Sequence, residues 1–435
     1  MTGSAVGLGN FWRFPYIAGE NGGGAFIIVY LGCVFAIALP IMMSEVLLGR
    51  RGRRNPITTM QLLGEEEAGQ PGWRVVGMLG MLAGILILSF YSVIAGWSFA
   101  YAVKAASGAF VAIDSGAVGA LFHAHTRNWL VLGAWHTLFM CMTVAVVARG
   151  VERGLERAVQ VIMPLLLVLV LVLVGHALHT GGFVQGVAFV LRPDFSALTA
   201  GGALVALGHA FFSLSLGMGV LMAYGAYLPQ ETSIAGTTIA VVLADTVIGL
   251  LAALAVFPIV FTHGLDPAAG PGLTFQTLPL AFGEMKAGVF VATTFFILLT
   301  VAAWTAAIGL LEPAVAWLSE TRDMARPKAA MLVGIVVWLL GFLTVFSFNL
   351  LKDVHFWRGT LYANLDYLAI NILLPLSGLS ITLFAGWVMC RNSSAQELDS
   401  GPGSTYRLWR FLTRFVAPAG VMLLVINAAL RLLHD

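Results

Sequence analysis

Residues 1–26 have the sequence MTGSAVGLGNFWRFPYIAGENGGGAF, and this stretch decides how the rest of the chain is interpreted. It is mostly apolar, as a membrane-spanning helix is, but glycine interrupts it at Gly3, Gly7 and Gly9. Glycine lowers the stability of a helix, and a broken helix leaves backbone carbonyls and amides without partners. In a bilayer such groups are tolerated only where they are buried in protein or line a cavity. We therefore expect a helix that is unwound near Ala5–Gly9, with its free backbone groups used to bind a ligand.

A second stretch, FFSLSLGMG at Phe211–Gly219, interrupts the sixth apolar run in the same way. Two interrupted helices at corresponding positions in the two halves of a membrane protein indicate the binding site of a transporter. Bared carbonyls suit a cation, and the amides at the start of a half-helix suit an anionic group. The two breaks together predict a site for a ligand that carries both signs of charge.

The composition indicates the class of protein. Of the 435 residues, 59% are hydrophobic and 10% are charged, and the mean hydropathy is +0.91, which indicates a polytopic membrane protein. The net charge of +2 gives no sign of a nucleic-acid partner. No H-E-x-x-H, G-x-S-x-G or P-loop motif occurs, so the sequence does not predict an intramembrane enzyme. The three cysteines, Cys33, Cys141 and Cys390, lie in or beside apolar runs and fit no metal site.

Eleven apolar runs are candidates for membrane spans, the first of them only as the outer half of a helix. They lie near residues 10–20, 25–48, 75–102, 128–148, 158–178, 201–228, 235–262, 288–318, 329–349, 362–390 and 410–432. Basic residues concentrate in alternate loops, so we expect these loops and the N-terminus in the cytoplasm and the C-terminus outside. Only about four residues precede the first break, where half a span needs about ten. We therefore expect a first helix truncated at its N-terminus.

The chain is expected to be a single all-α transmembrane domain over residues 1–435. Its coarse symmetry is five spans at 1–178, five more at 200–390 and an appended eleventh helix at 408–435. The fifth run contains Gly154 and Pro164, which either weaken the helix within the membrane or mark its entry. The long connection 263–287 is half apolar, and we expect it to dip back as an external plug. Residues 392–405 are expected to form a polar cytoplasmic linker.

Five motifs resemble those of the neurotransmitter:sodium symporters, and in particular the bacterial eleven-span amino-acid transporters of that family. They are AVGLGNFWRFPYIAGENGGGAF from Ala5, PIMMSEVLLGR from Pro40, FFSLSLGMG from Phe211, LEPAVAWLSE from Leu311 and LDYLAINILLPLSGL from Leu365. The resemblance covers nearly the whole chain. It implies two inverted five-helix repeats, broken first and sixth helices and a site midway across the membrane.

The resemblance implies two sites for Na⁺, a hard cation that binds oxygen ligands. The first would use the Ala5 carbonyl, the Asn10 side chain, the Ser213 hydroxyl and carbonyl, Asp245 and a carboxylate oxygen of the substrate. Some relatives have asparagine at the Asp245 position and need chloride nearby. An aspartate inside an apolar run is costly unless it is paired or neutralised, so it would make chloride unnecessary here. The alternative is a protonated structural aspartate.

The second sodium site would use the carbonyls of Gly3, Val6 and Ala302 and the Thr305 hydroxyl. Many relatives have a serine beside that threonine, where this chain has Ala306. One side-chain oxygen is therefore missing, and we expect the second site to bind Na⁺ more weakly than the first.

The resemblance also implies a site for an amino acid. Its carboxylate would be bound by the amides of Leu8 and Gly9 and by the Tyr91 hydroxyl. Its ammonium group would be bound by oxygens of Ala5, Phe212, Ser213 and Ser215. The side-chain pocket would be lined by Ile87, Phe212, Met218, Ala306, Gly309 and Leu310. Because this lining is apolar and leaves room, we expect a large, neutral, hydrophobic substrate, with tryptophan or tyrosine preferred over leucine. The alternative role for Tyr91 is an interfacial anchor.

Further polar residues resemble the gates of the family. Arg13 and Asp366 would close the outer vestibule above a lid formed by Tyr91 and Phe212; the alternative for Arg13 is a side chain that snorkels to the interface. Glu320 would be the acidic partner of the inner gate, whose arginine would precede Met1.

Three buried polar residues complete the expected set. Glu45 is expected to accept hydrogen bonds from amides freed by the breaks. His209 stands where relatives have glutamine, and either tunes the response to pH or is neutral and hydrogen-bonded. Tyr30 corresponds to a chloride-site residue and is expected to be structural.

The sequence thus predicts a multi-pass protein of the bacterial inner membrane that imports a hydrophobic, aromatic amino acid together with Na⁺ by alternating access. Two alternatives stay open. Paired broken helices also line channels, and a sensor of the same fold would bind the amino acid without transporting it. The expected partners are the amino-acid substrate and the lipid bilayer, and no nucleic acid.

Overall fold

The computed structural model describes residues 3, 7–150, 154–268, 270–398 and 403–434 of the chain. Within these ranges every regular element is a helix, which agrees with the expected all-α class. The longer helices are α6 (Arg74–Ala106), α8 (Trp129–Arg149), α9 (Gly154–Ala177), α13 (Ile234–Thr262), α15 (Gly288–Thr321), α16 (Arg326–Ser347) and α21 (Ala417–His434). Those of intermediate length are α3 (Gly24–Cys33), α4 (Leu39–Gly52), α5 (Pro56–Ala68), α7 (Ser115–Arg127), α11 (Ala200–Ser213), α14 (Leu273–Glu284) and α18 (Leu374–Leu383).

Short helices and π-helical segments complete the chain. The short helices are α2 (Phe14–Glu20), α10 (Phe183–Leu191), α12 (Val220–Ala226), α17 (Leu361–Tyr367), α19 (Arg391–Glu397) and α20 (Ser404–Phe411). The π-helical segments are η1 (Gly9–Arg13), η2 (Val34–Ala38), η5 (Leu368–Leu373), η6 (Phe384–Val388) and η7 (Leu412–Val416). Each π-helical segment continues directly into a neighbouring α-helix, so each forms part of a longer continuous helix.

Eight helical stretches within the described residues are long and apolar enough to cross a membrane. They are Gly24–Gly52, Pro71–Ala106, Trp129–Arg149, Ile234–Thr262, Gly288–Thr321, Arg326–Ser347, Leu361–Val388 and Ser404–Leu430. Each coincides with one of the eleven expected runs. In the other three runs, apolar helices of that length are not found among the described residues: the fifth contributes Met163–Ala177, the apolar part of α9, the sixth contributes Ala200–Ser213, and the first is described only from Gly7 onward apart from Gly3.

The sixth run is broken as the sequence predicts. Helix α11 ends at Ser213, α12 begins at Val220, and the residues between them are not helical. Ser215, Gly217 and Gly219 have φ angles of 56°, 71° and 74°. The left-handed region cannot continue a right-handed helix, and it is unfavourable for a residue with a side chain such as Ser215. The positive φ angles of these three residues therefore interrupt the helix, in addition to any effect of weak helix propensity.

The first helix is described only from Gly7 onward, apart from Gly3, so Ala5 and Val6 lie outside the described residues. Gly7 is not helical, and a helical conformation begins at Leu8. The Asn10 side chain holds this turn, because its Oδ1 accepts a hydrogen bond from the Gly7 N–H at 3.0 Å. The polar residue inside the apolar stretch thus bonds to the backbone N–H of Gly7, just before the helical conformation begins.

Two expectations about the connections need correction. Helix α9 continues through Pro164, so this proline neither starts the helix nor interrupts it in the described residues. Part of the expected linker 392–405 is helix α19, whose Glu397 accepts a hydrogen bond at 2.8 Å from the buried Arg50 at the end of α4. The linker is therefore partly folded against the helical body, because it supplies the partner of a buried cation.

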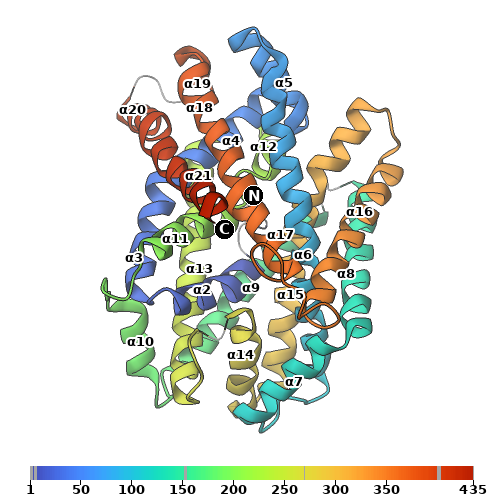
Figure 1. Ribbon diagram of the computed structural model, residues 1–435, viewed down its shortest axis with the longest axis vertical. Coiled ribbons are helices and arrows are strands. Elements are labelled where there is room, and N and C mark those ends of the chain that lie inside the picture. The colour runs from blue at the N-terminus through green and yellow to red at the C-terminus, as the bar shows by residue number, and fades with distance from the viewer. Residues whose placement is uncertain (1–2, 4–6, 151–153, 269, 399–402, 435) are drawn as a thin grey trace.

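Figure 1 shows that α5, α19 and α20 lie at one end of the molecule and α7, α10 and α14 at the other. We call these the α5 end and the α7 end. Helix α14 comes from the connection 263–287, and its apolar residues Leu273–Phe282 are buried almost throughout. It packs on η1 and α2, so the connection does fold back into the body at the α7 end of the first helix.

Candidate functional site

A buried carboxylate lies between the start of the described first helix and the break in the sixth run. Asp245 of α13 has no exposed surface, and its Oδ1 accepts hydrogen bonds from the Asn10 amide and the Ser213 hydroxyl, both at 2.8 Å. The Tyr30 hydroxyl donates to Oδ2 at 3.3 Å. Burying a carboxylate is costly unless hydrogen bonds or a cation compensate the charge. Asp245 thus bonds to both Asn10 and Ser213, the other described residues of the first expected sodium site, while Ala5 lies outside the described residues.

A second group of oxygens gathers around Thr305 in the middle of α15. Its hydroxyl oxygen lies within hydrogen-bond distance of two carbonyls, that of Gly3 at 2.7 Å and that of Ala302 at 2.8 Å. Three oxygens of the second expected sodium site therefore converge, from two segments about 300 residues apart in sequence. Val6, the remaining expected ligand, lies outside the described residues.

A small cavity of about 20 Å³ adjoins the Asp245 cluster. It is lined by Gly7, Gly9, Ile87, Tyr91, Phe212, Ser213, Ser215, Met218, Ala306 and Leu310. The Leu8 main chain is hydrogen-bonded to the Tyr91 hydroxyl, so this end of the cavity presents backbone amides beside a phenol. Such a volume holds about one water molecule and is far too small for an aromatic side chain.

Comparison with known proteins shows the family to which the chain belongs. The model of the sodium:neurotransmitter symporter family matches residues 1–111 and 126–434. The chain belongs to this family. The symporter also matches the crystal structure of MhsT in complex with L-phenylalanine with a TM-score of 0.94 and 39% identity, over 98% of this chain and 96% of MhsT.

Two sequence relatives of the symporter support this assignment. It is 36% identical to the uncharacterized sodium-dependent transporter YhdH of Bacillus subtilis, over 98% of this chain and 94% of the relative. It is 33% identical to an uncharacterized sodium-dependent transporter of Haemophilus influenzae, over 98% and 95%. The family and these relatives are transporters, so the protein is a membrane transporter and not an enzyme, as the sequence predicts.

The expected outer gate of the symporter is an ion pair. Arg13 and Asp366 form two hydrogen bonds, at 2.7 and 3.2 Å, and their side chains are 8% and 20% exposed. The Arg13 guanidinium also lies over the Phe212 ring, 4.8 Å from its centroid. The pair is therefore linked to the wall of the cavity through Phe212.

At the α5 end, Glu320 has a different partner from the expected arginine. Its carboxylate accepts hydrogen bonds from the Asn55 amide side chain at 2.7 Å and from the Asn55 N–H at 3.2 Å. Asn55 also caps the first turn of α5. Glu320 therefore connects the end of α15 to the turn between α4 and α5.

Glu45 lies beside the second break. Its Oε1 accepts a hydrogen bond at 2.6 Å from the N–H of Gly217, one of the amides that cannot take part in a helix. His209 differs from the hydrogen-bonded histidine that was one of its two expected states, because neither ring nitrogen has a hydrogen-bond partner among the described residues. Its ring instead packs against Phe14 and Tyr30, with centroids 5.6 and 5.5 Å away.

Two glycines near the cavity differ from the expected lining. Gly309 is absent from the lining of this small cavity, and a Cβ atom there would lie 2.8 Å from the Tyr224 hydroxyl. Gly7 lines the cavity but was not among the expected binding residues. Its position between Ala5 and Leu8, in the unwound stretch, was a sufficient signal. The bond between Tyr30 and Asp245 had no signal in the local sequence.

Proposed function

We propose that this symporter couples the inward movement of Na⁺ to the uptake of a large, neutral, hydrophobic amino acid by alternating access. The observation that carries the proposal is the position of Ser213, which bonds to Asp245 and also lines the cavity. A cation held by the Asp245 cluster and an amino acid held in the cavity would be direct neighbours. Each would then favour the binding of the other, which is the coupling that symport requires.

The two oxygen clusters would hold the transported sodium ions. The first would use Ala5, Asn10, Ser213 and Asp245, and the substrate carboxylate would complete it. The second, weaker site would use Gly3, Val6, Ala302 and Thr305. Because Asp245 supplies a negative charge at the first site, chloride would not be required.

The substrate carboxylate would meet the amides of Leu8 and Gly9 and the Tyr91 hydroxyl. Its ammonium group would meet oxygens of Ala5, Phe212, Ser213 and Ser215, and its side chain Ile87, Met218, Ala306 and Leu310. The bound phenylalanine of MhsT supports a large hydrophobic side chain. Because the cavity holds about 20 Å³, the walls must move apart to admit such a side chain, and Phe212 and Met218 are two of the large side chains that line it.

The architecture we propose is that of eleven spans. Residues 1–178 and 200–390 would form two inverted five-helix repeats, and 408–435 the eleventh helix. The α5 end carries the arginine-rich loop Arg50–Arg54 and would face the cytoplasm, with the N-terminus inside and the C-terminus outside. The plug helix α14 would then cover the site from outside.

Uptake into proteoliposomes tests the function. We expect radiolabelled tryptophan and tyrosine to accumulate above equilibrium with Na⁺ outside, and not with K⁺ outside, with leucine taken up more slowly. Replacing external chloride by gluconate should leave the rate unchanged. Sodium-dependent binding without accumulation would instead support a sensor, and flux far above carrier turnover a channel.

Asp366→Asn is expected to speed the release of bound amino acid to the outside by roughly ten-fold, because the variant loses the charge-assisted bonds to Arg13 that close the outer side. Release is measured by diluting protein loaded with labelled tryptophan into sodium buffer. Asp353→Asn, an exposed carboxylate in the loop before α17, is the control. An unchanged release rate in Asp366→Asn would show that the pair does not act as a gate.

A further inference from the structure

A cavity of about 420 Å³ lies between α8 and α16, away from the proposed transport site. It is lined from Thr137 to Ala148 on α8 and from Pro327 to Trp338 on α16, at the three- and four-residue intervals that mark one face of a helix. Part of this lining is exposed, as Ala145 is, so the cavity opens on the outer surface of the helical body. Both helices are long and apolar enough to cross a membrane, so that surface would face lipid.

The length of the cavity matches one leaflet of a bilayer. Each helix lines it over a rise of about 16 Å, and half of a bilayer's hydrocarbon core is about 15 Å thick. Helix α16 begins at Arg326, so the cavity starts at the α5 end of this helix and ends near its middle. A single acyl chain in one leaflet has the same extent and the same direction.

The inner end of the cavity offers no free polar group. Trp338 donates from Nε1 to the Thr137 hydroxyl at 2.8 Å, and that hydroxyl donates to the Gly133 carbonyl at 2.7 Å, so these polar atoms are already paired. Gly334 and Val144 line the cavity where α8 and α16 pack closely, because a Cβ atom on Gly334 would clash with the Val144 side chain. The remaining surface is hydrocarbon, which suits an apolar chain.

Two basic residues extend the lining at the α5 end. Arg149 of α8 lies four positions after Ala145, which lines the cavity. Lys328 of α16 lies three positions before Met331, which lines it from the other helix. Residues three or four positions apart share a face of a helix, so both cations lie on the lining faces. Both are exposed, and neither forms an ion pair with a described residue.

These two cations lie on adjoining turns. Arg326 donates from Nε to the Val147 carbonyl at 2.8 Å, which joins the first turn of α16 to the last turn of α8. Arg326 itself is paired with Glu312, so its charge is already compensated. The turn before α16 adds Arg322 and Asp323, whose charges cancel. Among the described residues, the rim of the cavity therefore carries an excess of positive charge, which attracts the phosphate of an anionic lipid.

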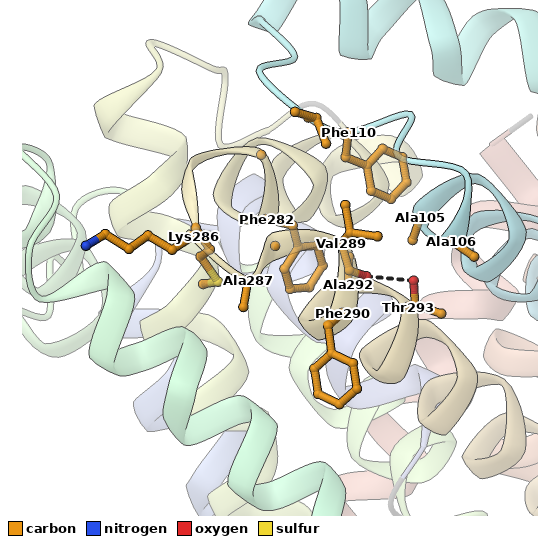
Figure 2. A pocket seen from close by; sticks show the side chains of 14 residues that line it. Ala105, Ala106, Phe110, Phe282, Lys286, Ala287, Val289, Phe290, Ala292 and Thr293 are labelled. Carbon is orange, nitrogen blue, oxygen red and sulfur yellow. Dashed lines mark hydrogen bonds between the residues drawn. The ribbon is translucent and has the colours of Figure 1, made fainter.

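A second cavity shows why an apolar lining alone does not identify the ligand. It has a volume of about 560 Å³ and lies at the junction of α14 and α15, where Phe110 and Phe282 border it (Figure 2). The Lys286 side chain points away from this cavity in Figure 2, and Lys104 lies over the Tyr101 ring, 5.3 Å from its centroid. Of these two cavities, the one between α8 and α16 combines a hydrocarbon lining with two cations in register with it.

We propose that the cavity between α8 and α16 binds an anionic phospholipid, with one acyl chain in the cavity and the phosphate between Arg149 and Lys328. The hydrocarbon lining, the length of one leaflet and the two cations at one end all fit this ligand, and a free phosphate would leave the apolar part unfilled. The site does not depend on the proposed function. Under the proposed orientation, in which the α5 end faces the cytoplasm, the lipid belongs to the cytoplasmic leaflet.

Native mass spectrometry of the purified full chain, titrated in detergent with dioleoyl phosphatidylglycerol or dioleoyl phosphatidylcholine, tests the headgroup. We expect one phosphatidylglycerol to bind roughly 20-fold more tightly than phosphatidylcholine, since each basic residue near the membrane surface contributes about five-fold. Arg149→Gln combined with Lys328→Gln should remove this preference, and Arg407→Gln, at an exposed position of α20 at the same end, should keep it. Equal binding of the two lipids to the unmodified chain, or a preference that persists in the double variant, would overturn the proposal.

The place of the acyl chain is tested separately. Ala145→Phe fills the cavity and should weaken phosphatidylglycerol binding about ten-fold, whereas Ala240→Phe, at an exposed position of α13, should not. Phosphatidylglycerol brominated in the middle of its chains should quench a smaller fraction of the tryptophan fluorescence in Trp338→Phe than in the unmodified chain, and this readout remains informative if Ala145→Phe does not fold. Tight binding to folded Ala145→Phe, or an unchanged quenched fraction in Trp338→Phe, would place the lipid elsewhere and reject the site. Neither measurement requires transport, so a failure of uptake leaves both results standing.

Discussion

Asp245→Asn is expected to weaken sodium binding by roughly 30- to 150-fold, the change that corresponds to a loss of about 2–3 kcal/mol of charge interaction in a buried site. The carboxylate is completely buried, and its neighbours Asn10, Ser213 and Tyr30 are neutral. The only full charge among these four side chains is therefore removed. An asparagine of almost the same size keeps the shape of the site, so the loss reports charge rather than packing.

The measurement is sodium-dependent binding of labelled tryptophan to purified protein, titrated with NaCl at constant ionic strength. Thr246→Val is a matched control, because Thr246 is the next residue on α13, is 5% exposed, and has a hydroxyl without a hydrogen-bond partner. Replacing an unpartnered buried hydroxyl by a methyl group should change affinity little. Chloride should restore part of the affinity of Asp245→Asn, since an anion can replace the missing charge. A sodium affinity within two-fold or so of the parent would mean that Asp245 is a protonated structural residue.

The break in the sixth run and the membrane class were predictable because they depend on local features. Glycines and polar residues inside an apolar run are visible in the sequence, and the φ angles at Gly217 and Gly219 are those that only glycine adopts easily. An aspartate inside the apolar run of α13 was equally visible. The negative charge of such a residue must be compensated, so the sequence alone predicted a cation or hydrogen-bond donors beside it.

The partners themselves were not predictable from residues alone. Asp245 and Tyr30 are 215 positions apart, and Glu320 and Asn55 are 265 apart. No periodicity or motif relates such positions, because the contact depends on how whole helices pack. For the same reason the sequence could not show that α19 would fold against the body, or that His209 would lack a hydrogen bond. The resemblance to a family supplied the set around the cavity, and of its expected side-chain pocket Gly309 alone is absent from the lining of the small cavity.

Gly217→Ala is the second substitution with a large expected effect. Gly217 has φ = 71°, and a Cβ atom there would lie 2.9 Å from the Leu374 carbonyl oxygen. The left-handed conformation alone costs an alanine about 1–2 kcal/mol, and the close contact with backbone in α18 adds to this. The same residue donates from its N–H to Glu45 at 2.6 Å, so any shift of the break also weakens that bond.

We expect Gly217→Ala to lower the thermal unfolding midpoint in detergent by about 3–8 °C and to weaken tryptophan binding by roughly ten-fold or more. Binding should suffer because Ser215 and Met218 flank Gly217 and both line the cavity. Gly32→Ala is the control, since a Cβ atom at Gly32 in α3 would meet no atom within 4 Å, and alanine suits a helix better than glycine. If Gly217→Ala matched Gly32→Ala in both midpoint and affinity, the break would not need a left-handed residue. The cation and amino-acid sites would then have to depend on side chains rather than on the bared backbone between α11 and α12.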